Sequence, residues 1–266
     1  MGLPVRVTST NSLRKGGGRM NRRDFGKKIT ATAIAAYAGS PPSFSKTKGE
    51  VAPALRKMQV IAGVRIVDSR IAQQAGELSR EASPPYLFNH ALRTFIFGSL
   101  IGKAQSLKFD EELLYLACIL HDLGLTERFA GDLPFEIAGA QAAGRFLLDH
   151  HYSEERVKIV WDGIAMHPLA IGQYKQAEIF LVGEGAGADV LGPPPERVAE
   201  NVKNDVIASV PRLGFKEAFV HTCSEVIRRH PSSAGRTFMR DIAERNVSGF
   251  KPPNICDLIA TAPFKE

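Results

Sequence analysis

The segment Leu113-Leu114-Tyr115-Leu116-Ala117-Cys118-Ile119-Leu120-His121-Asp122-Leu123-Gly124 joins a nearly continuous apolar run to a histidine and an aspartate. The acids before the run suit a helix N-terminus, and Gly124 suits a helix end. We therefore predict a helix over residues 111–123 that is buried on much of its circumference, with Cys118 as a core residue. Burying an imidazole and a carboxylate there costs free energy unless they are paired or bind a metal ion. His121 and Asp122 are thus the first candidates for chemistry.

Helical spacing of apolar residues continues outward from this segment, and two-residue alternation is almost absent beyond residue 55. Pro168 and the run 193–195 mark breaks, and Ser153 can cap a helix that runs to Met166. We predict an all-α helical bundle over residues 55–266, and the pattern weakens after Pro231. The other predicted helices cover residues 60–74, 87–104, 136–150, 175–191, 197–210 and 215–229.

Two further polar residues lie in similar apolar company: His90 near the start of the predicted helix 87–104, and Asp189 near the end of 175–191. Two histidines and two aspartates form a nitrogen and oxygen donor set that suits Zn, Mn or Fe. A metal ion with water in its remaining positions would lower the pKa of that water. Taken singly, a buried histidine is more often a satisfied core residue, and an aspartate near a helix end is more often a cap. The prediction therefore depends on their order and context.

The order His90, His121-Asp122, Asp189 resembles the H…HD…D pattern of HD-domain metalloproteins. The surrounding sequence is similar to a subgroup related to cyanamide hydratase. This similarity covers about residues 55–260 and lies in five ordered sequence blocks. These blocks are Asn89-His90-Ala91-Leu92-Arg93, Leu116 to Gly124, Phe135-Glu136-Ile137-Ala138-Gly139-Ala140, Ala165-Met166-His167 and Ala188-Asp189-Val190-Leu191-Gly192. The resemblance implies one divalent metal ion, Zn first with Mn or Fe as alternatives, held in a helical bundle by His90, His121, Asp122 and Asp189.

Three other residues are candidates for catalytic roles. His167, at a helix end, could bind a second metal ion, shuttle protons or hold the substrate; a simple contact with its own backbone carbonyls is about as common. Glu136 could orient water or a metal ligand, or only complement the helix dipole. Arg93 lies one turn beyond His90 and could contact an anionic substrate group, although a salt bridge is the commoner fate of such an arginine.

The leading functional hypothesis is a hydratase or hydrolase that acts on a small nitrile-like substrate, as the resemblance implies. The main alternative is a phosphohydrolase acting on a nucleotide or phosphate ester. Such a site should contain several cationic side chains, yet only Arg128 lies near His121 in sequence, and only Arg93 and Lys103 near His90. Two further alternatives are oxygenation at a di-iron site and a non-catalytic HD module that binds a ligand.

The N-terminal 38 residues are predicted to be an extension and a signal peptide. Met20-Asn21-Arg22-Arg23-Asp24-Phe25-Gly26-Lys27-Lys28 resembles a twin-arginine signal, and a short apolar stretch and Ala36-Tyr37-Ala38 follow it. Residues 39–54 resemble a linker. We therefore expect export to the periplasm through the twin-arginine route. The alternative is a cytoplasmic protein with a disordered basic tail.

The charge of the chain is concentrated in that segment. The net charge is +6, and residues 1–38 hold eight basic residues against one acid, so the remainder carries −1. This argues against a nucleic-acid partner. No apolar stretch is long enough for a membrane span. The expected partner is a small-molecule substrate, and a homodimer stays open because helical bundles often pair. Cys223 and Cys256 could form a bridge in an oxidising compartment.

Overall fold

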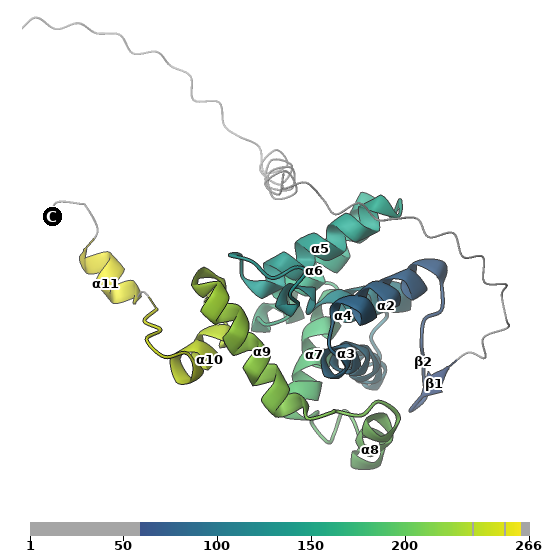
Figure 1. The fold of residues 1–266 in the computed structure, drawn as a ribbon. Helices are drawn as coiled ribbons and strands as arrows, with labels where there is room; N and C mark the ends of the chain where they lie inside the picture. Colours follow the sequence, from purple (N-terminus) through teal and green to yellow (C-terminus); the bar gives the residue numbers. More distant parts are fainter. Residues whose placement is uncertain (1–58, 236, 253, 262–266) are drawn as a thin grey trace, which may run out of the picture. The chain divides into compact units, whose positions relative to one another are not determined.

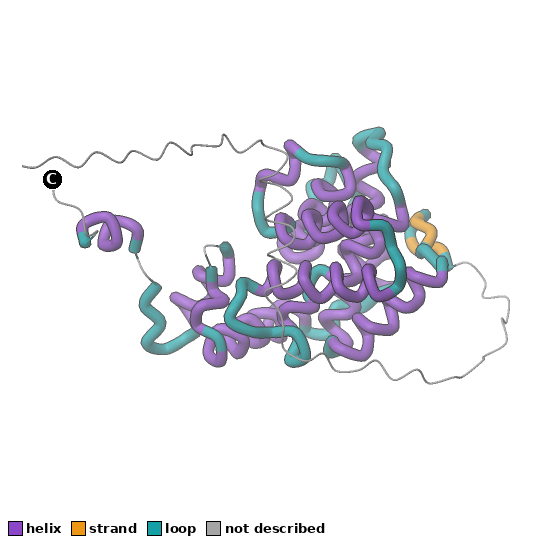
Figure 2. The backbone as a smooth tube through the Cα atoms, turned by 90° about the horizontal axis from the view of Figure 1, so that it is seen from above, coloured by secondary structure: helices purple, strands orange, loops and turns teal. Residues whose placement is uncertain are grey.

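The computed structural model describes residues 59–235, 237–252 and 254–261, and this part of the chain is mostly helical (Figure 1). The predicted all-α class is confirmed; Figure 2 shows strands, in orange, only as one small hairpin of the described chain. The α-helices are α2 Arg70–Ala82, α3 Pro85–Ala104, α4 Glu111–Leu120, α5 Phe135–Asp149, α6 Glu154–Met166, α7 Ala177–Leu191, α8 Glu200–Ser209, α9 Phe215–Arg229, α10 Phe238–Asn246 and α11 Ile255–Ala260. Short 3-10 helices are η1 Leu123–Leu125, η2 Ala170–Tyr174 and η3 Pro231–Ala234.

The predicted helix over residues 60–74 is wrong. Strands β1 Val60–Ile61 and β2 Val64–Arg65 form an antiparallel hairpin there. Ala62 and Gly63 form its turn, with φ of 49° and 78°, the left-handed conformation that two-residue hairpin turns require. Helix α2 begins only at Arg70, where the Ser69 side chain accepts a hydrogen bond from the Ala72 backbone. Apolar spacing that runs through a tight turn cannot reveal the turn.

Helices α3, α4 and α7 pack against one another (Figure 1), and five of the seven candidate site residues lie on α3 and α7 or in the turn that follows α4. The backbones of α3 and α7 approach closely because glycines lie at their contact. A Cβ atom on Gly185 would lie 2.1 Å from the Thr94 carbonyl oxygen, and one on Gly98 would lie 2.8 Å from the Leu181 carbonyl oxygen. Asp189 follows Gly185 by one helical turn, so this contact brings its carboxylate to α3.

Helix α4 ends at the turn that holds His121 and Asp122, and α5 packs directly on that turn. A Cβ atom on Gly124 would lie 1.9 Å from the Phe135 carbonyl oxygen, and one on Gly139 would lie 2.8 Å from the His121 carbonyl oxygen. The predicted helix 111–123 therefore stops at Leu120 and continues as η1. Small residues at both positions let α5 fix the backbone of the histidine-aspartate pair.

The described apolar residues form two clusters. The larger one includes most of the buried side chains of α2–α7, and the smaller one joins the start of α3, η1 and the start of α5 to α9 and α10. Leu87 and Leu125 belong to the smaller cluster, whereas Ala91 and Leu120 belong to the larger one. His90 and His121-Asp122 consequently lie where the two clusters meet.

All three cysteines are free in the structure, so the Cys223–Cys256 bridge is not formed. Cys118 is fully buried in the larger cluster, as predicted, whereas Cys256 is exposed. Within the described ranges, no helix combines the length and apolar character needed to cross a membrane. The predicted extension, signal peptide and linker lie outside the described residues.

Candidate metal centre

Three donor atoms from two helix ends converge at one buried point. The Nε2 atoms of His90 and His121 are 3.2 Å apart. The Oδ2 atom of Asp122 lies 3.5 Å from His90 Nε2 and 3.3 Å from His121 Nε2. All three residues are buried, with at most 4% of their surface exposed. Among the described residues, these three form the group with metal-ligand geometry.

The lone pairs of these atoms face one another. His121 Nδ1 is 2.7 Å from the Cys118 carbonyl oxygen, and His90 Nδ1 is 2.7 Å from Asp189 Oδ2. Because a carbonyl and a carboxylate accept only, each Nδ1 is the donor and each neutral ring has its lone pair on Nε2. Asp122 Oδ2 is buried with no hydrogen-bond partner in the described structure. Three converging acceptors repel one another unless a metal ion or a shared proton lies between them.

The spacing and the donor types fit a divalent cation. A tetrahedral zinc ion with bonds of about 2.0–2.1 Å would separate its ligand atoms by roughly 3.3–3.4 Å. The three observed distances lie between 3.2 and 3.5 Å. His90, His121 and Asp122 would therefore hold such an ion, and the mixed set also suits Mn or Fe.

The electrostatics of the triad keep Asp122 ionised. Burial alone would raise its pKa, but His121 and His90 outweigh this and lower the pKa of Asp122 to about 2. Burial lowers the pKa of His121, but the Asp122 carboxylate, the Cys118 carbonyl and Asp189 together outweigh it, so the net direction is upward. For His90, burial dominates and lowers the pKa. A carboxylate therefore faces neutral His90 and a second imidazole whose protonation it favours, and a bound cation would replace that proton.

Asp189 lies behind His90 rather than with the converging atoms. Its Oδ2 accepts from His90 Nδ1, and Arg93 donates from Nε to Oδ1 at 2.7 Å and from Nη2 to Oδ2 at 2.8 Å. Arg212 Nη1 donates to Oδ1 at 2.8 Å. Burial would raise the pKa of Asp189, but the bonds from Arg93 and His90 hold it well below its ordinary value. This placement differs from the four-ligand set predicted from the sequence.

Arg93 also differs from its predicted role, which was contact with an anionic substrate group. Its side chain is fully buried and forms a bidentate ion pair with Asp189. The remaining Nη1 donates to the Pro211 carbonyl oxygen at 3.0 Å. The salt bridge, the alternative weighed from the sequence, is what the structure contains.

His167 lies beside the triad and also lines a cavity. Its ring meets His121 edge to face with centroids 4.9 Å apart, and meets Phe135 at 5.5 Å. Its Nδ1 donates to the Ile164 carbonyl oxygen at 2.6 Å, so Nε2 has the lone pair. Burial, aided by His121, lowers the pKa of His167 to about 3. His167 is therefore a neutral acceptor next to the candidate centre.

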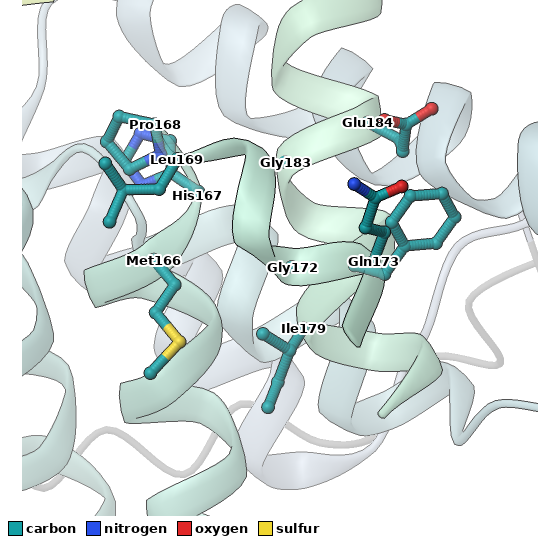
Figure 3. A pocket seen from close by; sticks show the side chains of 10 residues that line it. Met166, His167, Pro168, Leu169, Gly172, Gln173, Ile179, Gly183 and Glu184 are labelled. Atoms are coloured by element: carbon teal, nitrogen blue, oxygen red, sulfur yellow. The ribbon is translucent and has the colours of Figure 1, made fainter. Parts of the chain in front are cut away.

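The cavity has a volume of about 260 Å³ and lies between the end of α6, η2 and α7 (Figure 3). Figure 3 shows Met166 and His167 on one side, and Gln173 and Glu184 on the other. The remaining lining residues are Pro168, Leu169, Gly172, Ile179, Phe180 and Gly183. His167 is the residue that belongs both to this cavity and to the ring contacts of the triad.

Glu136 is buried in the first turn of α5, next to the turn that carries the histidine-aspartate pair. Its Oε2 has no hydrogen-bond partner within the described chain. Burial raises the pKa of Glu136, against a smaller effect of its own backbone N–H. Complementing the helix dipole does not require a buried, unpartnered oxygen, so the structure keeps Glu136 a candidate for contact with a bound group.

The sequence gave no signal for Arg212 or for the aromatic side chains of α9. Phe215 packs on the His90 ring at 4.7 Å, and Phe219 lies 5.9 Å from it. Both follow His90 and the His121-Asp122 pair by more than 90 positions, and no local spacing connects them to these residues. Their proximity depends on how α9 packs against α3.

Comparison with known proteins supports the assignment of the sequence motif to the HD superfamily. Residues 87–204 match the model of the HD domain family, which supports placing this part of the chain in the HD superfamily. A protein of Clostridium beijerinckii described as "Uncharacterized protein" is 32% identical over 82 residues. That match covers 29% of this chain and 52% of the relative, so the chain spans about half the length of the relative.

Proposed function

We propose that the protein is a metal-dependent hydrolase or hydratase of the HD type, which adds water to a small uncharged electrophile such as a nitrile. The observation that carries this proposal is the convergence of three lone-pair atoms, from His90, His121 and Asp122, in a buried site. The HD-domain match of residues 87–204 supports a metal-dependent hydrolase in general. The preference for a nitrile rests on the sequence resemblance to cyanamide hydratases. A divalent cation held by these residues would supply Lewis acidity and lower the pKa of a water molecule bound to it.

Aromatic rings lie around the buried candidate centre. Ring-to-ring contacts follow a closed circuit that starts and ends at His90, with neighbouring centroids between 4.7 and 6.1 Å apart. The circuit runs through His90, Phe215, Phe219, Phe238, Phe135, His167 and His121. Aromatic surroundings favour a small substrate with little charge, because transferring an ion into them costs free energy.

His167 has the geometry of a proton acceptor in this reaction. Its Nε2 has a lone pair, because the Nδ1 proton is donated to the Ile164 carbonyl oxygen. When water adds to a substrate, the attacking water molecule loses a proton. A neutral imidazole can accept this proton directly or through one bridging water molecule. We therefore assign His167 the role of general base or proton shuttle.

The alternative is a phosphohydrolase, which the HD-domain match also supports. A phosphoryl substrate needs cationic side chains that can turn toward it. Arg93 and Arg212 lie close to the centre, and both donate to the Asp189 carboxylate. The charges that act most strongly on Asp122 are those of histidines. The structure therefore favours the uncharged substrate.

The proposal is tested first by the metal content of the purified protein, measured by elemental mass spectrometry. About one equivalent of Zn, Mn or Fe supports it, and absence of metal even after reconstitution contradicts it. The loaded protein is then assayed with cyanamide and small nitriles, by release of the amide or urea product, and with p-nitrophenyl phosphate. Turnover of the phosphate ester alone would replace the hydratase proposal by the phosphohydrolase alternative.

A further inference from the structure

We infer that Asp189 is a positioning residue that holds His90 for metal binding, and that Arg212 locks Asp189 in this role from the loop before α9. The inference rests on the proposed metal centre, and it assigns the fourth motif residue and Arg212 to the support of a ligand rather than to the ligand set.

The lone pairs of Asp189 are fully used. A carboxylate has about four acceptor positions, two on each oxygen. Oδ1 accepts from Arg93 Nε and Arg212 Nη1, and Oδ2 accepts from His90 Nδ1 and Arg93 Nη2, all at 2.7–2.8 Å. Asp122 Oδ2 accepts none in the described structure. A cation would take the vacant carboxylate oxygen without cost, whereas at Asp189 it would have to break a charge-assisted hydrogen bond.

The bond from His90 to Asp189 sets which nitrogen faces the centre. With the proton on Nδ1 and directed at Asp189, the lone pair of His90 is on Nε2, where His121 and Asp122 converge. Metal-binding histidines commonly donate their second N–H to a carboxylate, which fixes the ring and raises the basicity of the ligand nitrogen. Removing that support should weaken the metal site without removing a ligand.

Arg212 connects this support to the loop over residues 210–212. One nitrogen, Nη1, donates both to Asp189 Oδ1 at 2.8 Å and to the Asp189 carbonyl oxygen at 2.7 Å. From α3, Asn89 Nδ2 and Arg93 Nη1 donate to the Pro211 carbonyl oxygen at 2.9 and 3.0 Å. Three side chains therefore hold the loop to α3 and α7.

The same loop leads directly into α9, whose Phe215 packs on the His90 ring. The guanidinium carbon of Arg212 lies over the Phe215 ring, 4.8 Å from its centroid. Asp189 thus holds the edge of the His90 ring through a hydrogen bond, and Phe215 packs on its face. Arg212 contacts both Asp189 and Phe215. The Arg212 side chain is still 26% exposed, so truncating it leaves no sealed cavity.

The test uses the full chain, freed of metal with a chelator, and measures Zn²⁺ affinity by competition with a chromophoric chelator. We expect Arg212→Ala to bind one equivalent with about 10-fold lower affinity, the lower end of the range for residues that support a ligand. Arg212→Lys should recover most of the affinity, because a single nitrogen makes both bonds. Arg197→Ala is the matched control: Arg197 also pairs with an acid of α7, Glu184, and its side chain is 37% exposed.

Equal affinity of Arg212→Ala and Arg197→Ala would overturn the inference and leave the proposed function intact. Failure of the unmodified protein to bind Zn²⁺ would instead overturn the proposed function itself. Circular dichroism of each metal-free variant measures its helix content and so distinguishes a loss of metal affinity from a loss of fold.

A second variant tests Asp189 directly with Co²⁺ in place of Zn²⁺. A thiolate ligand adds a sulfur-to-cobalt charge-transfer absorption to the spectrum of the unmodified protein. We expect this absorption in Asp122→Cys, where the side chain replaces a ligand, and not in Asp189→Cys. Its appearance in Asp189→Cys would make position 189 a ligand position and overturn the inference.

Discussion

His90 and His121 present their Nε2 atoms to each other at 3.2 Å, although the Nδ1 proton of each ring is already donated elsewhere. Two lone pairs at this distance, with the Asp122 carboxylate beside them, form a site with the donor types and spacing that suit a divalent cation. These residues lie near the start of α3 and just after the end of α4. Each of them can therefore be replaced separately.

Replacing Asp122 with alanine should abolish tight metal binding. The change removes the one anionic donor of the triad and leaves two neutral imidazoles. Elemental analysis after dialysis measures the effect, with Asp132→Ala as control because Asp132 is exposed. Stoichiometric metal in the Asp122→Ala protein would refute the assignment of the centre.

Replacing His167 with glutamine should lower kcat by about 10²-fold or more while metal content is retained. The loss follows from removing the neutral acceptor beside His121. His150→Gln is a matched control, because His150 also donates from Nδ1 to a backbone carbonyl, that of Phe146 at 2.7 Å. If both variants keep full activity toward the substrate found in the screen, His167 has no catalytic role.

Two glycines of α7 should respond to alanine in opposite directions. At Gly185 a Cβ atom would lie 2.1 Å from the Thr94 carbonyl oxygen, so the substitution forces α3 and α7 apart and should cost about 3 kcal/mol. At Gly187 nothing lies within 4 Å, and alanine should stabilise the helix by about 0.5–1 kcal/mol. Urea unfolding of the metal-free variants measures both. Equal effects at the two positions would contradict the close packing of these helices.

Replacing Glu136 with glutamine should stabilise the metal-free protein by about 1 kcal/mol at pH 7, since the buried Oε2 atom of the carboxylate has no hydrogen-bond partner in the described structure. The pKa of Glu136 is raised from 4.5 by burial. The unfolded chain therefore ionises first as pH rises, and the native protein loses stability between pH 4.5 and the folded pKa. Glutamine cannot ionise, so its advantage should be absent at pH 4 and present at pH 7.

Chemical unfolding at these two pH values tests the Glu136 prediction. The control is Glu178→Gln, because the Glu178 carboxylate accepts from the Asp110 backbone N–H at 2.7 Å. A Glu136→Gln protein that is less stable at pH 7 would mean that the carboxylate is stabilised by a group that the prediction leaves out.

We also propose that residues 1–38 direct export through the twin-arginine route. Changing Arg22-Arg23 to Lys-Lys should block export, because that route reads the paired arginines. The measurement is the distribution of the full chain between periplasmic and cytoplasmic fractions. Normal export of the variant would discard the twin-arginine interpretation, and a cytoplasmic location of the unmodified chain would favour the basic-tail alternative.

Helix positions could be predicted where a single apolar period extends over several turns. The helices at α3, α4 and α9 were found within a few residues of their observed ends. The hairpin at residues 60–65 was missed, because its two strands have two residues each and cannot display alternation. Helices α10 and α11 follow Pro231, where the apolar pattern was too weak to assign.

By itself, the sequence determined the helical class and pointed to His90, His121, Asp122 and Asp189 as metal ligands. Helix formation and burial of a short polar pair depend on spacing within one or two turns. Only the tertiary structure decided that Asp189 supports His90 and that Arg93 and Arg212 support Asp189. These bonds join residues up to 99 positions apart. Their formation depends on the approach of α3 to α7, which glycine at positions 98 and 185 permits, and on the loop that leads into α9. A hydrogen bond is decided by a few tenths of an ångström, and that precision exists only after the helices have packed.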